Sequence, residues 1–527
     1  MVVRQLRWPR NPPMKEIMKT NTILRGVSVD YLGTVFVILA GFIAVPYYLV
    51  FISKEQYGLW LAINSVVLLV ALVDLATDQF LTTVTANDGK FYSEEYADYL
   101  TSILFVKAMS AAVVVLISSM VFTLIASILS IEENFKAESQ KTFSLAVLAL
   151  VCGIFSNAIP AILYARHHYS LVNACVNFFL ILSVVSTVIL LWMGYGIIAF
   201  PMAQLIGTIL QGIVLTVFLK QRFPHVGLKI KSFKFVGKSE LLGYATKFQA
   251  LRWLYTFRTQ YISIAITNLV GATYLAQYML TSRLAQLGPT LSAKFANAFL
   301  PTIANLIEAG DTKKVANIFI KLSKVLMRVA IFSGIVLFTL NKSFVAIWVG
   351  VDNYAGDDAL MFIVMYMVIF IAMAQFAIVI FASKKFEKWV FWGMFEMIAA
   401  VVFSYLFSMR FGLMGVLMGF VFSSLPTQAY LFRIVLRQLD LGTWKFIKEI
   451  FCYSLKPNII PLVAAFAMTF FKIEVKTWGG LIGLASFFLM VHLVFEIIQT
   501  FKSRENGVKN KISNSLKVSF PLGTNDS

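Results

Sequence analysis

The chain has few of the residues on which soluble proteins and enzymes depend. Charged residues make up only 13% of its 527 residues, hydrophobic residues make up 59%, and the mean hydropathy is +0.80. A soluble domain of this length cannot cover so much apolar surface with so little charge. The composition therefore excludes a soluble fold and indicates a membrane protein.

Cysteine and histidine are also scarce, with three and four residues. Cys152, Cys175 and Cys452 fall inside apolar segments without the CxxC spacing typical of a zinc site, and they form no disulfide framework. DxD, HExxH and Walker motifs are absent, and no large loop could house a catalytic centre. We therefore expect no metal, no cofactor and no enzymatic activity.

What the chain does have is a series of long apolar runs. A helix crosses a bilayer with about 20 mainly apolar residues. The expected fold is an all-α polytopic membrane protein with about 14 transmembrane helices. The predicted spans are 26–51, 57–84, 99–129, 143–164, 171–192, 197–219, 241–267, 272–300, 318–340, 359–382, 389–409, 413–432, 450–471 and 481–500.

Lysine and arginine collect in alternate loops between these spans. The loops on the side of the N-terminus hold 31 of the 45 basic residues, and the opposite loops hold seven. Because basic residues stay on the cytoplasmic side, this bias predicts that both termini are cytoplasmic. The net charge of +19 is then explained by topology and by contact with anionic lipids, so we expect no nucleic-acid partner.

The spans group as six plus six plus two. We expect a cytoplasmic segment over 1–25, a six-helix lobe over 26–220, a basic linker over 221–240, a second six-helix lobe over 241–436, two further helices over 437–501 and a cytoplasmic tail over 502–527. Two parallel lobes suit alternating access by rocking. Pro46, Pro160, Pro289 and Pro461 offer kinks for such motion.

Topology leaves seven basic residues inside predicted spans, five of them on helices seven and eight. A charge near the bilayer centre costs about 2.5–3.5 kcal/mol on insertion scales, so it usually faces a wet cavity or a partner. For Lys247 and Lys294, snorkelling to the interface is an equal alternative. The seven are Lys107, Lys247, Arg252, Arg258, Arg283, Lys294 and Lys456.

Helical spacing arranges the polar residues of helices seven and eight into stripes. A stripe on helix eight comprises Arg283, Gln286, Thr290, Lys294 and Asn297, and one on helix seven comprises Gln249, Arg252, Thr256, Thr259 and Gln260. Two consecutive spans that each carry a polar, positive stripe predict the walls of a hydrated cavity.

Carboxylates inside the spans are open to two interpretations each. Asp74 and Asp78 lie four residues apart on predicted helix two, where pairing with Lys107 would form either a structural clasp or a gating site. Glu396, near the middle of predicted helix eleven, either pairs with a buried arginine or binds a coupling proton or Na⁺.

Several short stretches resemble polysaccharide-transport proteins of the MATE-like MOP superfamily. In the first lobe these are VPYYL at 45–49, YGLW at 57–60 and DLA at 74–76, where Ala76 departs from the glycine of many relatives. In the second lobe they are LLGY at 241–244, Pro301, Gly310 with Asp311, and IWVG at 347–350. The resemblance covers about residues 25–435, and it depends on the order and spacing of these motifs.

This resemblance implies an oligosaccharide flippase of the Wzx type in the bacterial cytoplasmic membrane. Such a protein moves undecaprenyl-pyrophosphate-linked repeat units to the outer leaflet for O-antigen, capsule or exopolysaccharide synthesis. Its implied partners are this lipid-linked oligosaccharide, membrane lipids, a coupling H⁺ or Na⁺, and a polysaccharide polymerase with chain-length proteins. A lipid II flippase of the same superfamily would share the anionic lipid, whereas a multidrug or cation antiporter would need a more acidic cavity.

Residue roles follow from the resemblance and the stripes together. We expect Arg252, Arg258 and Arg283 to hold the anionic head group, with Lys294 near its entrance. Gln249, Gln286 and Asn297 would bond sugar hydroxyls, and Arg25 would attract pyrophosphate at the cytoplasmic mouth. Glu396 is the coupling candidate.

Overall fold

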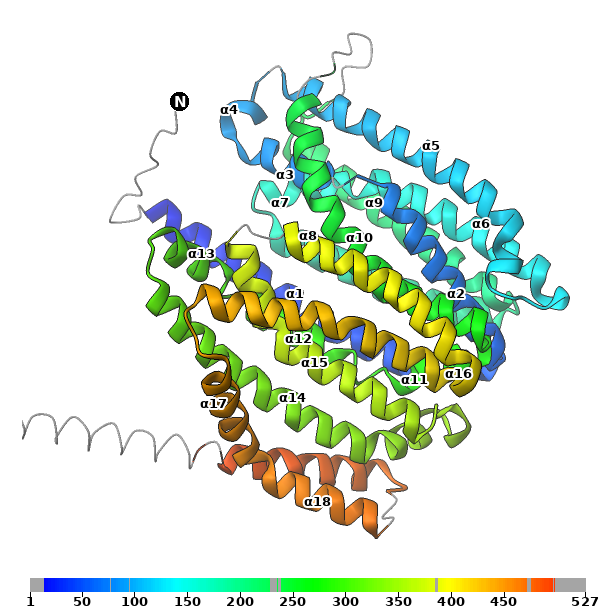
Figure 1. The fold of residues 1–527 in the computed structure, drawn as a ribbon. Coiled ribbons are helices and arrows are strands. Elements are labelled where there is room, and N and C mark those ends of the chain that lie inside the picture. The colour runs from blue at the N-terminus through cyan, green and yellow to red at the C-terminus, as the bar shows by residue number, and fades with distance from the viewer. Residues whose placement is uncertain are drawn as a thin grey trace, which may run out of the picture. The chain divides into compact units, whose positions relative to one another are not determined.

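The computed structural model describes residues 14–75, 77–93, 95–227, 235, 238–383, 387–471, 475–495 and 497. For residues 14–28, 30, 31, 238–248, 250, 251 and 387 it describes the backbone alone. The described residues form helices joined by turns, with no strand among them (Figure 1). The side chains of Arg25 and Lys247, and the predicted tail over 502–527, lie outside this description.

In chain order, the first helices are α1 (Met14–Phe51), α2 (Lys54–Val70), η1 (Ala71–Val73), α3 (Thr77–Ala86), α4 (Asp88–Phe91), α5 (Tyr96–Ile128), α6 (Glu133–Ser156), α7 (Ala158–Ala165), α8 (Tyr169–Trp192), η2 (Gly196–Ile198), α9 (Ala199–Arg222) and α10 (Lys238–Leu269). They are followed by α11 (Ala272–Thr281), α12 (Leu287–Asn297), α13 (Leu300–Glu308), α14 (Thr312–Val349), η3 (Val351–Asn353), α15 (Asp357–Ala382), α16 (Glu387–Gln438), α17 (Thr443–Leu455), η4 (Lys456–Asn458), α18 (Ile459–Phe470) and a last helix, Trp478–Phe495.

Among the described residues, 11 helical segments are long and apolar enough to cross a membrane. Three predicted spans are not among them as separate segments. They correspond to α10, to the short pair α11 and α12, and to one half of α16, whose two halves count as a single segment. The 11 candidate segments expose many large apolar side chains, such as Val50, Trp192 and Phe466, as lipid contact requires. The chain is therefore a multi-pass membrane protein, and the number 14 stays a prediction.

The chain divides into two compact units, comprising Met1–Gln277 with Gly393–Phe420, and Tyr278–Trp392 with Val421–Ser527. The first unit contains α1–α10, and it also contains the hairpin within α16. The lobe boundaries expected from the sequence stay predictions.

In the first unit, α3, α5, α7 and α9 enclose an apolar core around residues such as Leu81, Ile103 and Leu163, none of which is exposed. A second cluster of aromatic rings joins α2 to α9. There the rings of Trp60 and Phe200 stack with centroids 5.0 Å apart. Aromatic pairs of this kind contribute about 0.5–1.5 kcal/mol beyond their burial.

The second unit is built on α14 and α15, which run side by side (Figure 1). Phe319 on α14 packs edge-on against Phe376 on α15, with ring centroids 4.9 Å apart, and stacks on Phe446 of α17 at 5.6 Å. Three helices of this unit therefore share one aromatic contact region.

Within α16, two helices meet at a tight turn. Gly412 has φ 51° and ψ −129°, a conformation that side-chain-bearing residues rarely adopt. Beyond the turn, a Cβ on Gly415 would collide with the Phe407 carbonyl, and one on Gly419 would collide with the Ser404 backbone. Small residues at these positions let the two helix backbones approach closely, as in many membrane helix pairs.

Four predicted spans are wrong as continuous helices. The second breaks between Val70 and Thr77, the fourth at Asn157, the eighth over 282–286 and the thirteenth over η4. Pro160, Pro289 and Pro461 each occupy the third residue of the helix that follows a break. Proline has no N–H and clashes with the carbonyl four residues earlier, so the preceding helix ends while the new first turn tolerates the ring.

Candidate functional site

The break in the second span is the feature around which the predicted residues of the first unit gather. After η1, Asp74 adopts an extended conformation with φ −66° and ψ 113°, and α3 begins at Thr77. Such a break frees backbone carbonyls from helical bonding. Inside a membrane those carbonyls need other partners, because each unsatisfied group costs several kcal/mol.

Side chains of α10 supply those partners. Nε2 of Gln249 and Nε1 of Trp253 both donate to the Leu72 carbonyl, the latter at 3.1 Å. Nη1 of Arg252 donates to the Asp74 carbonyl at 2.9 Å. Gln249 and Arg252 were both expected to line a cavity. In the structure they instead bond backbone carbonyls of a neighbouring span. Arg252 keeps further N–H donors beyond this bond, and its role toward a substrate stays a prediction.

Lys107 on α5 occupies the same region and is fully buried. Its Nζ lies 2.8 Å from Oδ1 of Asp78 and donates to the Ile154 carbonyl at 2.9 Å. Asp78 belongs to the first turn of α3, and Ile154 lies just before the break between α6 and α7. The expected pairing of Lys107 with Asp78 is present, and it joins α5 to two interrupted spans.

Three side-chain oxygens near the break make no hydrogen bond within the described part of the chain. They are Oδ1 of Asp74, Oγ1 of Thr77 and Oε1 of Gln249. Asp74 is only 7% exposed, and its carboxyl interacts electrostatically with Lys107, Asp78 and Arg252. The expected placement of Asp74 and Asp78 on one continuous helix is wrong, because η1 ends at Val73 and α3 begins at Thr77.

Arg258 and Glu396 meet between α10 and the α16 hairpin. Nη2 of Arg258 lies 3.1 Å from Oε1 of Glu396, and their side chains are 20% and 10% exposed. Of the two alternatives for Glu396, the structure has the pairing with a buried arginine. Such a pair neutralises both charges inside the membrane at the cost of desolvating them.

In the second unit, Arg283 lies half-buried in the turn that separates α11 from α12. Gln286 is exposed and its Nε2 donates to Oγ of Ser282 at 2.9 Å. Because the helix is interrupted here, the single stripe expected from Arg283 to Asn297 is wrong. On α12 itself, half-buried Lys294 and exposed Asn297 share one face.

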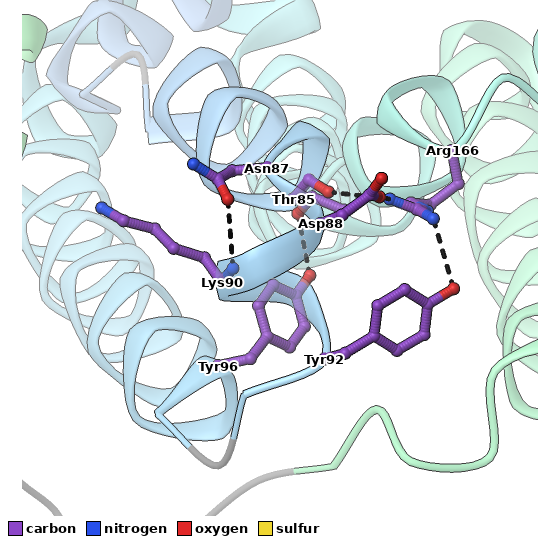
Figure 2. A network of polar contacts seen from close by, with 7 residues as sticks. All are labelled: Thr85, Asn87, Asp88, Lys90, Tyr92, Tyr96 and Arg166. Carbon is purple, nitrogen blue, oxygen red and sulfur yellow. Dashed lines mark hydrogen bonds and ion pairs between the residues drawn. The ribbon is translucent and has the colours of Figure 1, made fainter.

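Figure 2 shows a polar network in the first unit that was not expected from the sequence. It contains Lys90 and Arg166, two of the 31 basic residues that were counted on the side of the N-terminus. The Arg166 guanidinium lies 2.6 Å from the Asp88 carboxylate, donates to the Tyr92 hydroxyl at 3.3 Å and covers the Phe91 ring at 4.5 Å. The network comprises Thr85, Asn87, Asp88, Lys90, Tyr92, Tyr96 and Arg166.

His168 lies two residues after Arg166 and is the N-cap residue of α8. Burial lowers the pKa of His168, and the nearby Arg222, Arg166 and His167 lower it further. Its ring contacts Phe218 at a centroid distance of 5.4 Å. The loop therefore favours the neutral imidazole.

Two further residues carry interactions that the sequence reasoning missed. Trp253 follows Arg252 directly in the sequence. Its indole N–H, which can only donate a hydrogen bond, is the signal that could have pointed to a carbonyl partner. Arg328 was counted among the loop cations, yet it is only 7% exposed and lies 4.0 Å from the centroid of the Tyr453 ring. A hydropathy pattern cannot separate a buried cation–π pair from a snorkelling side chain.

The family described as polysaccharide biosynthesis protein matches residues 23–307, more than half of the chain. No curated protein matches the sequence. Among solved structures, the lipid II flippase MurJ in an inward closed conformation is similar with a TM-score of 0.69 and 16% identity, covering 90% of this chain and 99% of that chain.

Two transporters of the MOP superfamily are similar as well. An inward-facing multidrug resistance MATE transporter gives a TM-score of 0.57 at 14% identity, covering 79% of this chain and 98% of that chain. A transporter from Pyrococcus furiosus gives 0.52 at 15% identity, covering 82% and 97%. Identities this low establish the fold alone. The chain therefore belongs to the polysaccharide biosynthesis protein family and has the fold of MOP superfamily transporters.

Proposed function

We propose that this protein is a flippase that moves undecaprenyl-pyrophosphate-linked oligosaccharide units from the cytoplasmic to the outer leaflet of a bacterial cytoplasmic membrane. The observation that carries the proposal is the presence of arginines in predicted spans of both units, with Arg252 and Arg258 on α10 and Arg283 beyond α11. Membership of the polysaccharide biosynthesis family supports an oligosaccharide as the cargo.

Arginine suits this cargo chemically. A guanidinium presents a rigid fork of donors that matches phosphate oxygens, and its attraction to an anion is stronger where water is scarce. Arg252 uses one donor on the Asp74 carbonyl and has others to offer a pyrophosphate. A transporter of cationic drugs would instead need a cavity dominated by carboxylates.

Lipid II is the second candidate cargo. MurJ is similar over 90% of this chain, against 79% for the MATE transporter, so the resemblance to the lipid II flippase extends further along the sequence. Both candidate cargoes carry an undecaprenyl pyrophosphate, so they differ in the group that is attached to it.

The proposed cycle uses alternating access, with both termini in the cytoplasm and the polyprenyl tail remaining in lipid. Gln286, Asn297 and Lys294 would meet the sugars and the entrance of the path, and Arg25 would meet the pyrophosphate first. A polymerase with chain-length proteins would consume the flipped units. A proton or Na⁺ gradient would drive the return.

Deleting the gene tests the cargo. If the proposal is correct, lipid-linked repeat units accumulate in the inner leaflet of a strain that lacks paralogues. Normal appearance of these units in the outer leaflet would contradict it. Purified protein in vesicles that contain either the repeat-unit lipid or lipid II then separates the two candidates, since the preferred cargo flips faster.

Arg252→Ala and Arg283→Ala test the mechanism at matched membrane abundance. We expect each variant to lose at least about tenfold in flipping rate, because a lost charged hydrogen bond costs about 1.5–3 kcal/mol. Arg410→Ala is the matched control, since Arg410 is exposed at the tip of the α16 hairpin. Full transport by both interior variants would remove the arginines from the mechanism.

A further inference from the structure

Asp74 combines two properties that a purely structural carboxyl does not have. It lies where the second span is interrupted, and its Oδ1 is buried without a hydrogen bond among the described residues. A buried carboxylate without such bonds is unfavourable when ionised, unless nearby positive charge compensates it. The charges around Asp74 therefore decide whether it carries a proton.

Three charged groups from three elements act on Asp74. They are Lys107 on α5, Asp78 on α3 and Arg252 on α10. Lys107 already pairs with Asp78 at 2.8 Å, so these two largely cancel. Arg252 donates to a neutral carbonyl, and its positive charge remains available to stabilise the ionised form of Asp74. Among these described groups, Arg252 is therefore the cation whose charge is not already offset by Asp78.

We propose that Asp74 is a proton-binding site linked to anion binding at Arg252. The inference rests on the proposed function, because it takes the pyrophosphate as the anion that reaches Arg252. When that anion neutralises the guanidinium, the ionised form of Asp74 loses its compensating charge. The carboxylate then takes one proton from solvent through an oxygen lone pair, and no other bond forms or breaks.

Linkage makes the effect reciprocal. If the anion promotes proton binding at Asp74, the proton raises the affinity for the anion by the same factor. The site therefore binds the anion and the proton together, and it releases them together. The proposal places the linked proton on Asp74 and not on Glu396, because Glu396 is already neutralised by Arg258 at 3.1 Å.

The test measures binding of undecaprenyl pyrophosphate to the full chain in nanodiscs over a range of pH. For the wild type we expect affinity to rise as pH falls, by at most about tenfold per pH unit, the limit for one linked proton. A dye in weakly buffered solution should report proton uptake when the lipid is added. Asp74→Asn should bind the lipid with no pH dependence and no uptake.

Controls separate this site from others. Asp352→Asn changes an exposed carboxyl and should keep the wild-type pH dependence. Glu396→Gln should keep it too, and loss of the linkage in Glu396→Gln but not in Asp74→Asn would overturn the assignment. Replacing Na⁺ by choline should change nothing, and a requirement for Na⁺ would contradict a proton site.

The remaining outcomes are also decisive. If Asp74→Asn does not fold, Arg252→Gln takes its place and should abolish proton uptake. Uptake unchanged in Arg252→Gln would refute the linkage. Wild-type binding that is independent of pH ends the inference and leaves the flippase proposal standing, whereas no binding at any pH refutes both.

Discussion

Lys107 offers a direct test of how the interrupted spans are held together. Lys107→Met keeps most of the side-chain volume and removes the ammonium. The change deletes the ion pair with Asp78 at 2.8 Å and the bond to the Ile154 carbonyl at 2.9 Å. Removing one partner of a fully buried ion pair costs about 3–5 kcal/mol. The Asp78 side chain is 33% exposed, so water compensates part of this loss.

We therefore expect Lys107→Met to lower the free energy of unfolding by about 3 kcal/mol, with the unbonded Ile154 carbonyl contributing about 1 kcal/mol of it. Unfolding by SDS in mixed micelles, followed by tryptophan fluorescence, measures the change. Adding Asp78→Asn should restore part of the loss, because the second change removes the charge that the first leaves unpaired.

Lys136→Met is the matched control. Its partner Glu133 lies at 2.9 Å, but the two side chains are 43% and 84% exposed. Exposed pairs contribute about 0–1 kcal/mol. A Lys107→Met protein as stable as the Lys136→Met protein would refute the view that a buried ammonium joins α5 to α3 and α6.

Three further predictions concern packing, charge and pH. Gly415→Ala should lower stability by about 1–3 kcal/mol, because the added Cβ would collide with backbone atoms. Gly153→Ala is the control and should not lower stability, because the space around its Cβ is open. Thermal unfolding in detergent compares the two variants. Arg258→Ala should destabilise the fold, because it leaves the Glu396 charge without its partner. In the same assay the double variant Arg258→Ala with Glu396→Gln should be more stable than Arg258→Ala alone. A double variant that is no more stable would show that the two residues are not energetically coupled. The folded state lowers the pKa of His168, so as the pH falls the unfolded state takes up a proton on this residue before the folded state does. Thermal stability should therefore fall as the pH drops below about 6.5. His168→Phe should weaken that pH dependence.

Apolar length and composition were sufficient to predict a polytopic helical protein, because a spanning helix must be long and apolar wherever it lies. Three of the four breaks also left a local sign, since Pro160, Pro289 and Pro461 each lie in the first turn of the helix that follows a break. The break after Val70 left none, because ALVDLA at 71–76 contains neither proline nor glycine. Side chains of α10, far away in sequence, bond the carbonyls that the break frees.

The candidate site was predictable in composition and less so in geometry. Charge counting found Arg252, Arg258 and Lys107, because an interior charge always needs a reason. Their partners depend on where the helices break. The stripe on predicted helix eight failed because angular spacing assumes a continuous helix, and the turn over 282–286 removes Arg283 and Gln286 from it.

The bonds from α10 to the interrupted span also constrain biogenesis. Arg252 and Asp74 are 178 positions apart, so a ribosome adding about 5–20 residues per second needs roughly 10–35 s to pass from one to the other. During that interval the second span is in the membrane while the side chains that will bond its carbonyls are not yet made. The nascent chain should therefore be a client of insertases and proteases until α10 emerges, and truncated products ending before Gln249 should be degraded rapidly.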